Sequence, residues 1–179
     1  MKYNPEIHHR QSIRLKGYDY SVAGAYFVTI CVQGREYLFG EISDGIMKLH
    51  DAGRMIETWW AKLPGNFKNV ESDRYVIMPN HFHGIIVFVG ADPRVCPVGE
   101  GAHMGAPLQR VVQWFKTMTI NAYIRGVKQS DWPPFPGRLW QRNYYERIIR
   151  DESELNAVRK YILDNPMNWS EDEDNPVVA

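Results

Sequence analysis

The sequence has few cysteines, no long hydrophobic run and no leader-like start. Its two cysteines, Cys31 and Cys96, are too few for a disulfide framework and are not spaced as a CxxC motif. The longest apolar run is far below the roughly 18–20 residues that a membrane-spanning helix needs. The first residues lack the apolar centre of a secretory signal peptide. We therefore expect a cytoplasmic protein with no membrane partner.

Net charge is also absent, because 21 basic residues balance 21 acidic ones. The charges are nevertheless segregated along the chain. Residues 106–150 carry eight basic side chains against two acidic ones, and residues 151–179 carry eight acidic against two basic. A concentrated basic stretch is typical of a phosphate-binding surface. A solvated surface that binds nothing also fits this pattern.

The hydrophobic content, 44%, and the aromatic content, 13%, are sufficient for a packed core. We expect one domain over residues 1–170 and a disordered acidic tail over 171–179. Hydrophobic periodicity predicts strands within 24–34, 73–79, 81–89 and 139–150. It predicts helices within 47–63, 107–126 and 152–165, and a mobile Gly- and Pro-rich loop at 90–107.

This order of elements, β-α-β-β-α-β-α, predicts the α+β class. Four strands with two intervening helices are typical of a ferredoxin-like, or RRM-like, antiparallel sheet with helices packed on it. The helix predicted within 152–165 follows the last strand and is an addition to this ferredoxin-like core.

Two histidines lie at the start of a predicted core strand, in the stretch "MPNHFHGI". His81 and His83 are two residues apart, so both rings project from one face of the strand, while Phe82 projects from the other. This spacing suits two ligands of one metal ion, and it equally suits a structural hydrogen-bonded pair. A zinc hydrolase would need further ligands soon after, but an apolar run follows instead.

The C-terminal helix supplies further candidates in "ELNAVRKYILDNP". Tyr161 and Asn165 are four residues apart and therefore share a helix face. An amide oxygen can serve as a third ligand of a hard or borderline divalent cation, and a phenol beside such a cation can act as a nucleophile. Packing of the tyrosine and helix capping by the asparagine remain the alternatives.

These two motifs together resemble those of the HUH single-tyrosine transposases. The segments "RYVIMPNHFHGIIVF" and "LWQRNYYERIIRDESELNAVRKYILDNPMNW" are most similar to the REP-associated tyrosine transposases, and the resemblance covers roughly residues 18–170. It implies His81 and His83 as metal ligands, Tyr161 as the nucleophile and Asn165 as the additional ligand. The compact insertion-sequence branch usually has Gln at the position of Asn165.

The resemblance implies metal-dependent cleavage and joining of single-stranded DNA at hairpin sites. The cofactor would be Mg²⁺ or Mn²⁺, and the intermediate a covalent 5′-phosphotyrosine. Either a monomer or a homodimer is compatible with the sequence. Tyr144 and Tyr145 are rival nucleophiles, and we interpret them as packing or base-stacking residues.

The hairpin DNA partner leads to predicted contacts in the basic segment. The candidates for phosphate contacts are Arg110, Lys116, Arg125, Arg142 and Arg147. The candidates for base stacking are Trp140, Trp114 and Tyr144. Two other functions stay open: a hairpin-binding protein that has lost cleavage, and an RRM-like nucleic-acid-binding module, which would expose aromatic residues on its central strands.

Overall fold

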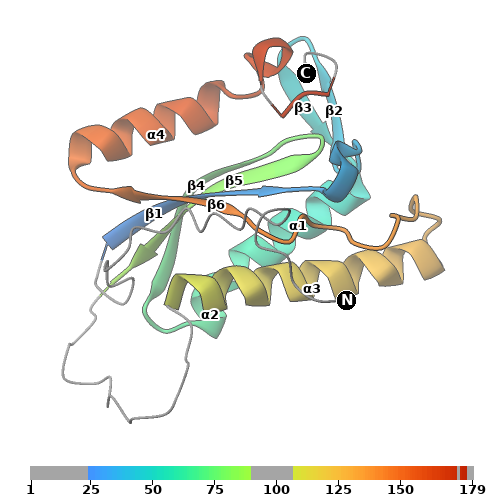
Figure 1. Cartoon of the computed structure of the whole chain (residues 1–179), viewed down its shortest axis with the longest axis horizontal. Coiled ribbons are helices and arrows are strands. Elements are labelled where there is room, and N and C mark those ends of the chain that lie inside the picture. The colour runs from blue at the N-terminus through green and yellow to red at the C-terminus, as the bar shows by residue number, and fades with distance from the viewer. Residues whose placement is uncertain (1–23, 90–106, 173, 177–179) are drawn as a thin grey trace, which may run out of the picture.

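The computed structural model describes residues 24–89, 107–172 and 174–176 (Figure 1). The strands are β1 (Gly24–Cys31), β2 (Gly40–Ser43), β3 (Ile46–Leu49), β4 (Val70–Ile77), β5 (His81–Phe88) and β6 (Tyr145–Ile149). The helices are α1 (Asp51–Ala61), α2 (Leu63–Asn66), α3 (Pro107–Gln129) and α4 (Glu152–Asp164), with 3₁₀ turns η1 (Gln33–Arg35) and η2 (Trp169–Glu171). Within the described ranges, none of the helices is both long and apolar enough to cross a membrane. The loop predicted over 90–107 lies, apart from its last residue, outside the described residues.

The main sheet has four strands in the order β4-β5-β1-β6, and every neighbouring pair is antiparallel. With α1 and α3 as the connections that follow β1 and β5, this is the ferredoxin-like arrangement. The predicted fold class is therefore confirmed. Strands β4 and β6 form the two edges, and β5 and β1 lie at the centre.

A two-stranded hairpin, β2–β3, was not predicted from the sequence. The helix expected over 47–63 begins only at Asp51, because Ile46–Leu49 forms the second strand of this hairpin. The turn is Asp44-Gly45, with φ values of 55° and 72°. Two consecutive positive φ angles are the requirement of a type I′ hairpin turn, which an Asp-Gly pair meets readily.

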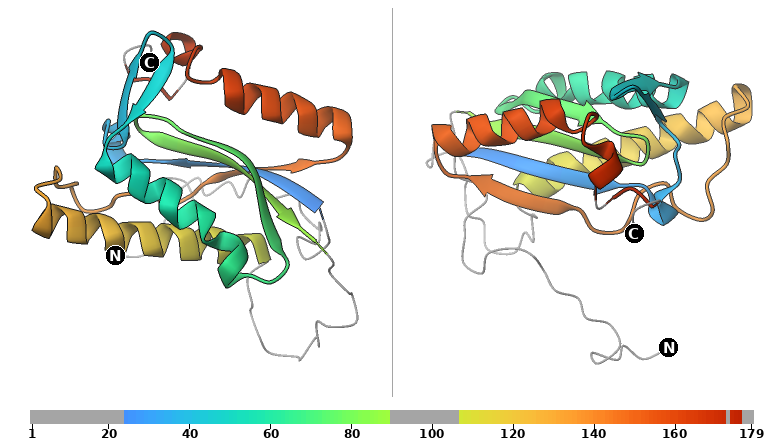
Figure 2. Two further views of the ribbon diagram at one scale, coloured as in Figure 1. Left: turned by 180° about the vertical axis from the view of Figure 1, so that it is seen from behind. Right: turned by 90° about the horizontal axis from the view of Figure 1, so that it is seen from above.

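The two faces of the sheet are covered by different helices (Figure 1; Figure 2). Helices α1 and α3 pack on one face and α4 on the other. The larger core lies under α1 and α3 and includes Tyr26, Phe82, Trp60 and Phe115. The smaller core lies under α4 and consists of Ile85, Ile149, Val158 and Ile162.

Helix α4 is defined by its N-terminal cap and by a short buried stripe. The carboxylate of Asp151 accepts a hydrogen bond from the backbone N–H of Glu154 at 2.8 Å, which satisfies one of the free donors of the first turn. Val158 and Ile162, four residues apart, are its buried side chains. This stripe is small, so packing alone is a weak constraint on the helix.

Ion pairs connect α4 to both edge strands. On one side Arg159 contacts Asp73 of β4, with its Nε 3.1 Å from Oδ1 and 3.2 Å from Oδ2. On the other side Arg147 of β6 pairs with Glu154. The helix is therefore tied across the sheet at both flanks, which fixes the side chains that it presents between them.

Candidate active site

The two predicted histidines lie together at the centre of the sheet, on the face that α4 covers. His81 and His83 are both buried, and their Nε2 atoms are 3.0 Å apart. Phe82 points to the other face, where its ring lies 4.6 Å from that of Trp60 and 5.3 Å from that of Phe115. The strand alternation predicted from the sequence thus holds in the structure.

Asn80 fixes the tautomer of His81. Its side-chain N–H₂ donates to the carbonyl oxygens of Asp174 (2.7 Å) and Arg35 (3.2 Å). Its Oδ1 therefore faces Nδ1 of His81, at 2.9 Å, and can only accept. Nδ1 of His81 is consequently the donor, and the lone pair of its Nε2 is directed toward His83.

Thr29 plays the corresponding part for His83, with one difference. Its Oγ1 lies 2.8 Å from Nδ1 of His83. A hydroxyl can donate or accept, so His83 can carry its proton on either ring nitrogen. With the proton on Nε2, it donates to His81; with the proton on Nδ1, both Nε2 lone pairs converge on one point.

Both imidazoles are held neutral. Burial, with a smaller contribution from the nearby Arg35, lowers the pKa of His81 to about 3. Burial also holds the pKa of His83 well below its usual value, with a smaller contribution from His81. Neutral imidazole is the form that binds metal ions.

Asp172 completes a possible metal-binding group that sequence reasoning missed. One ligand atom each from His81, His83 and Asp172 lie within 4.8 Å of one another. Oδ2 of Asp172 is 4.0 Å from Nε2 of His81. Burial raises the pKa of the Asp172 carboxyl, and a hydrogen bond from Asn165 opposes that rise. Nothing in the sequence pattern separates this aspartate from its acidic neighbours.

The segment that carries Asp172 packs against the site, whereas a disordered tail was expected over 171–179. Asp174 forms an ion pair with Arg35, and Asn175, which is buried, accepts a hydrogen bond from the Tyr37 hydroxyl at 2.8 Å. The side-chain amide of Asn175 donates to the carbonyl of Trp169 at 2.9 Å. Residues 173 and 177–179 lie outside the described part of the chain.

Asn165 is buried at the C-terminal end of α4, close to the same group. Its Oδ1 has no hydrogen-bond partner among the residues that the structure describes. A buried carbonyl oxygen without a donor is costly, and a cation would satisfy it. This geometry fits the predicted role, which itself remains a prediction.

Tyr161, on α4, lies beside the histidines. Its hydroxyl is 3.4 Å from Nε2 of His83, and its ring packs edge-on against Phe27. The side chain is 47% exposed, so it is accessible to a ligand from solvent. The structure therefore brings Tyr161, Asn165 and both histidines together, as the sequence-based prediction requires.

The two rival tyrosines face opposite sides of the sheet. Tyr144 packs against the main core, under α3, on the face away from the histidines. Tyr145 pairs with Thr29 in register and is 54% exposed on the histidine face.

Two of the predicted DNA contacts have other partners. Trp140 is 2% exposed, and its indole N–H donates to Oγ1 of Thr119 at 2.9 Å, so the predicted base stacking does not fit its burial. The ammonium of Lys116 donates to the carbonyl oxygens of Gln141 (2.7 Å), Arg142 (3.3 Å) and Asn143 (3.3 Å). Its three donors are thus engaged by backbone, and burial lowers its pKa to about 8.

The other predicted contacts are divided between the two faces. Arg110 and Arg125 are exposed on α3, across the sheet from the histidines. Arg142 and Arg147 are exposed near the β6 edge. Trp114 packs against Trp59 and Phe67 and is only partly exposed. Their predicted roles are not tested by these positions.

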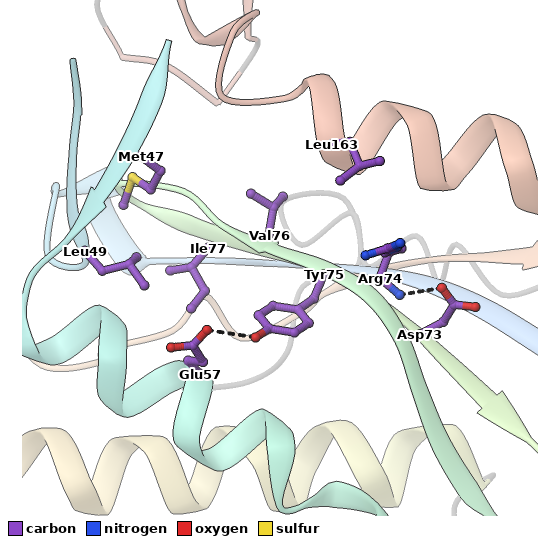
Figure 3. A pocket seen from close by; sticks show the side chains of 9 residues that line it. All are labelled: Met47, Leu49, Glu57, Asp73, Arg74, Tyr75, Val76, Ile77 and Leu163. Carbon is purple, nitrogen blue, oxygen red and sulfur yellow. Dashed lines mark hydrogen bonds between the residues drawn. The ribbon is translucent and has the colours of Figure 1, made fainter. Parts of the chain in front are cut away.

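A cavity of about 410 Å³ lies at the other edge of the sheet, along β4 (Figure 3). Its walls come from β3, α1, β4 and α4, and include Leu49, Glu57, Tyr75 and Leu163. Tyr75 donates a hydrogen bond to Glu57 there at 2.9 Å. Neither histidine nor Tyr161 lines this cavity, so the candidate chemistry lies on the sheet face and not in the hollow.

Comparison with known proteins gives a fold relative and a sequence relative. A solved structure of a REP-associated tyrosine transposase bound to a REP hairpin superposes with a TM-score of 0.58 at 18% identity, covering 87% of this chain and 73% of that one. At this identity the likeness shows a shared fold. No protein-family model matches the chain. An uncharacterized protein of Haemophilus influenzae is 40% identical over 181 residues, which span 96% of each chain. The chain therefore belongs to the same family as this Haemophilus influenzae protein.

Proposed function

We propose that the protein is a metal-dependent endonuclease and strand transferase that acts on single-stranded DNA beside a hairpin. The observation that carries this proposal is the position of the Tyr161 hydroxyl, 3.4 Å from Nε2 of His83 and next to the buried His81, His83 and Asp172 group. The shared fold with a transposase that was solved on a REP hairpin supports the same ligand class.

The residues present fit a divalent cation. They offer two neutral imidazoles, one carboxylate and the amide oxygen of Asn165, whose lack of a partner within the described residues is otherwise unexplained. A set of nitrogen and oxygen donors without a thiolate suits Mn²⁺. Mg²⁺ prefers oxygen donors, so it suits a set in which fewer of the ligands are nitrogens. We propose that His81, His83, Asn165 and Asp172 hold this ion. When bound, it would polarise the scissile phosphate and offset its developing charge.

Tyr161 is the proposed nucleophile. Its phenolic oxygen forms a bond to phosphorus while the bond from phosphorus to the 3′ oxygen breaks. The phenol gives up its proton and the departing 3′ oxygen gains one, so a 5′-phosphotyrosine and a 3′-hydroxyl result. The reverse reaction with another 3′-hydroxyl joins strands without an external energy source, because the covalent link conserves the phosphodiester energy.

Basic residues near β6 suit the phosphates of the cleaved strand. Arg142 and Arg147 are exposed, and Arg147 pairs with Glu154 of α4, the helix that carries Tyr161. We propose Arg110 and Arg125, on the opposite face, as contacts to a more distant part of the hairpin. Lys116 is not included, because its donors are bound to three carbonyls.

An RRM-like binding module is a poorer match. Such a module would present aromatic side chains on its open central strands. Here α4 covers the corresponding face of β5 and β1, and buried histidines take the central positions.

A cleavage assay tests the proposal. A library of hairpin oligonucleotides with randomised single-stranded arms is incubated with the protein in Mn²⁺, Mg²⁺ or EDTA. We expect metal-dependent cuts that leave a 3′-hydroxyl, and loss of cutting in Tyr161→Phe with hairpin binding retained. Binding without any cutting by the wild type would instead show a hairpin-binding protein, and cutting in EDTA would contradict the metal assignment.

A further inference from the structure

One exposed aromatic residue lies in the same row of the sheet as the candidate site. Val76, His83, Thr29 and Tyr145 are paired in register across β4, β5, β1 and β6. Directly paired residues project from the same face of a sheet, so Tyr145 points to the side of His83 and Tyr161. Neighbouring strands are about 4.8 Å apart. The Cα atom of Tyr145 is therefore roughly 10 Å from that of His83, a distance of one or two nucleotides.

The ring of Tyr145 is available to a ligand. It is 54% exposed, although a tyrosine side chain buries a large area wherever packing permits. Within the described residues it makes no ring contact, side-chain hydrogen bond or ion pair. The fold therefore has no evident structural use for this side chain.

The backbone that presents Tyr145 is firmly held. Lys116 reaches through from α3 and donates to the carbonyls of the three residues 141–143, which lead into β6. Tyr144 anchors the next position in the main core. Tyr145 itself pairs with Thr29 of β1. Because this support is rigid, the protein loses little conformational entropy when a flat ligand binds the ring.

Positive charge lies along the same strand. Arg147 is two residues beyond Tyr145, so it projects from the same face at a distance of about 6.8 Å. Its side chain is 67% exposed and pairs with Glu154. The Glu154 side chain is only 13% exposed, whereas most of the Arg147 side chain faces solvent. A guanidinium carries five N–H donors, so Arg147 can contact a phosphate from its solvent side while it keeps Glu154.

We propose that Tyr145 forms the floor of a nucleobase subsite. It stacks on a base of the single-stranded DNA next to the phosphate that Tyr161 attacks, and Arg147 contacts a flanking phosphate. This subsite rests on the proposed function. Stacking on a tyrosine ring accepts any base, so the subsite contributes affinity and alignment of the strand.

Binding measurements without metal separate this proposal from cleavage. Fluorescence anisotropy in EDTA compares a labelled dT₁₂ with a 12-mer of abasic residues, which keeps the phosphates and removes the bases. Tyr145→Ala is expected to weaken binding of dT₁₂ by about 5- to 150-fold, as for the loss of one stacked base, and to leave the abasic strand unaffected. Tyr145→Phe keeps the ring and is expected to bind as the wild type does.

Two further variants define the controls. Arg147→Gln is expected to lower the slope of log affinity against log salt by about 0.7, the loss of one phosphate contact, whereas Tyr145→Ala leaves this slope unchanged. Ile46→Ala removes another exposed apolar side chain, 65% exposed, on the β2–β3 hairpin and is expected to change nothing.

Several results would overturn the subsite. These are wild-type affinity for dT₁₂ in Tyr145→Ala, equal losses on the abasic strand, or no binding of dT₁₂ by the wild type. A change of oligomeric state in Tyr145→Ala with unchanged DNA binding would assign the ring to a protein interface instead. Failure of the proposed function appears differently, as dT₁₂ binding that depends on Tyr145 without cleavage of any hairpin.

Discussion

Replacing Thr29 with valine removes the only oxygen within reach of Nδ1 of His83 that the described structure provides, and hardly changes the shape of the side chain. Thr29 and His83 are both buried, so water does not readily replace the hydroxyl. In the wild type the hydroxyl accepts when Nδ1 is protonated and donates when it is not. Thr29→Val withdraws both options.

Two magnitudes follow from this geometry. A buried polar atom left without a partner costs about 1–3 kcal/mol, so the free energy of unfolding is expected to fall by that amount without metal. In the metal-binding tautomer the proton must sit on Nδ1, where no acceptor remains. Loss of such an outer hydrogen bond typically lowers metal affinity about 10- to 100-fold.

Urea unfolding in EDTA measures the first quantity, and isothermal titration with Mn²⁺ measures the second. Thr29→Ser keeps the hydroxyl and serves as the control, with metal affinity close to that of the wild type. If Thr29→Val binds Mn²⁺ as tightly as Thr29→Ser does, the hydroxyl does not orient His83, and the argument on tautomers is wrong.

Two other predictions concern packing and pH. A Cβ added at Gly84 would lie 2.6 Å from the Trp60 ring, so Gly84→Ala is expected to lose about 1–3 kcal/mol in chemical denaturation; Gly65→Ala, where no atom lies within 4 Å, is the control, and equal losses would contradict the packing argument. Hydrogen bonds from Arg159 lower the pKa of Asp73 in the folded protein. The ionised carboxylate therefore stabilises the fold fully above its unfolded pKa of about 3.9, and this stabilisation is lost as the pH falls through the lower folded pKa. Asp73→Asn is expected to flatten the acid limb of the stability profile measured by urea unfolding from pH 2 to 6, and an unchanged limb would refute this.

The part of the site that follows from local periodicity was predictable from the sequence. Two residues of separation place His81 and His83 on one face of a strand, and four residues place Tyr161 and Asn165 on one face of a helix. The strand order then brings these faces together. The two periodicities depend on residues near one another in the chain. In the structure Tyr161 lies against His83, and Asn165 contacts Asp172 of the same group.

The remainder depends on contacts between distant segments. Asp172 reaches the histidines because Asp174 and Asn175 bind Arg35 and Tyr37, which lie more than 130 residues earlier. Burial also determines which of the basic residues can contact DNA, and the sequence does not show which residues are buried. Lys116 resembles a phosphate ligand in sequence, but its ammonium is directed at three carbonyls by the path of residues 141–143, which no local pattern encodes.

The central claim is that Tyr161 becomes covalently joined to DNA. The most direct test is to incubate the protein with Mn²⁺ and hairpin oligonucleotides labelled 3′ of the cut, separate the products on a denaturing gel, and map the adduct by peptide mass spectrometry. The account predicts a 5′-phosphodiester on the peptide that contains Tyr161, absent in Tyr161→Phe and retained in Tyr144→Phe and Tyr145→Phe. An adduct on Tyr144 or Tyr145, or one that persists in Tyr161→Phe, would contradict it.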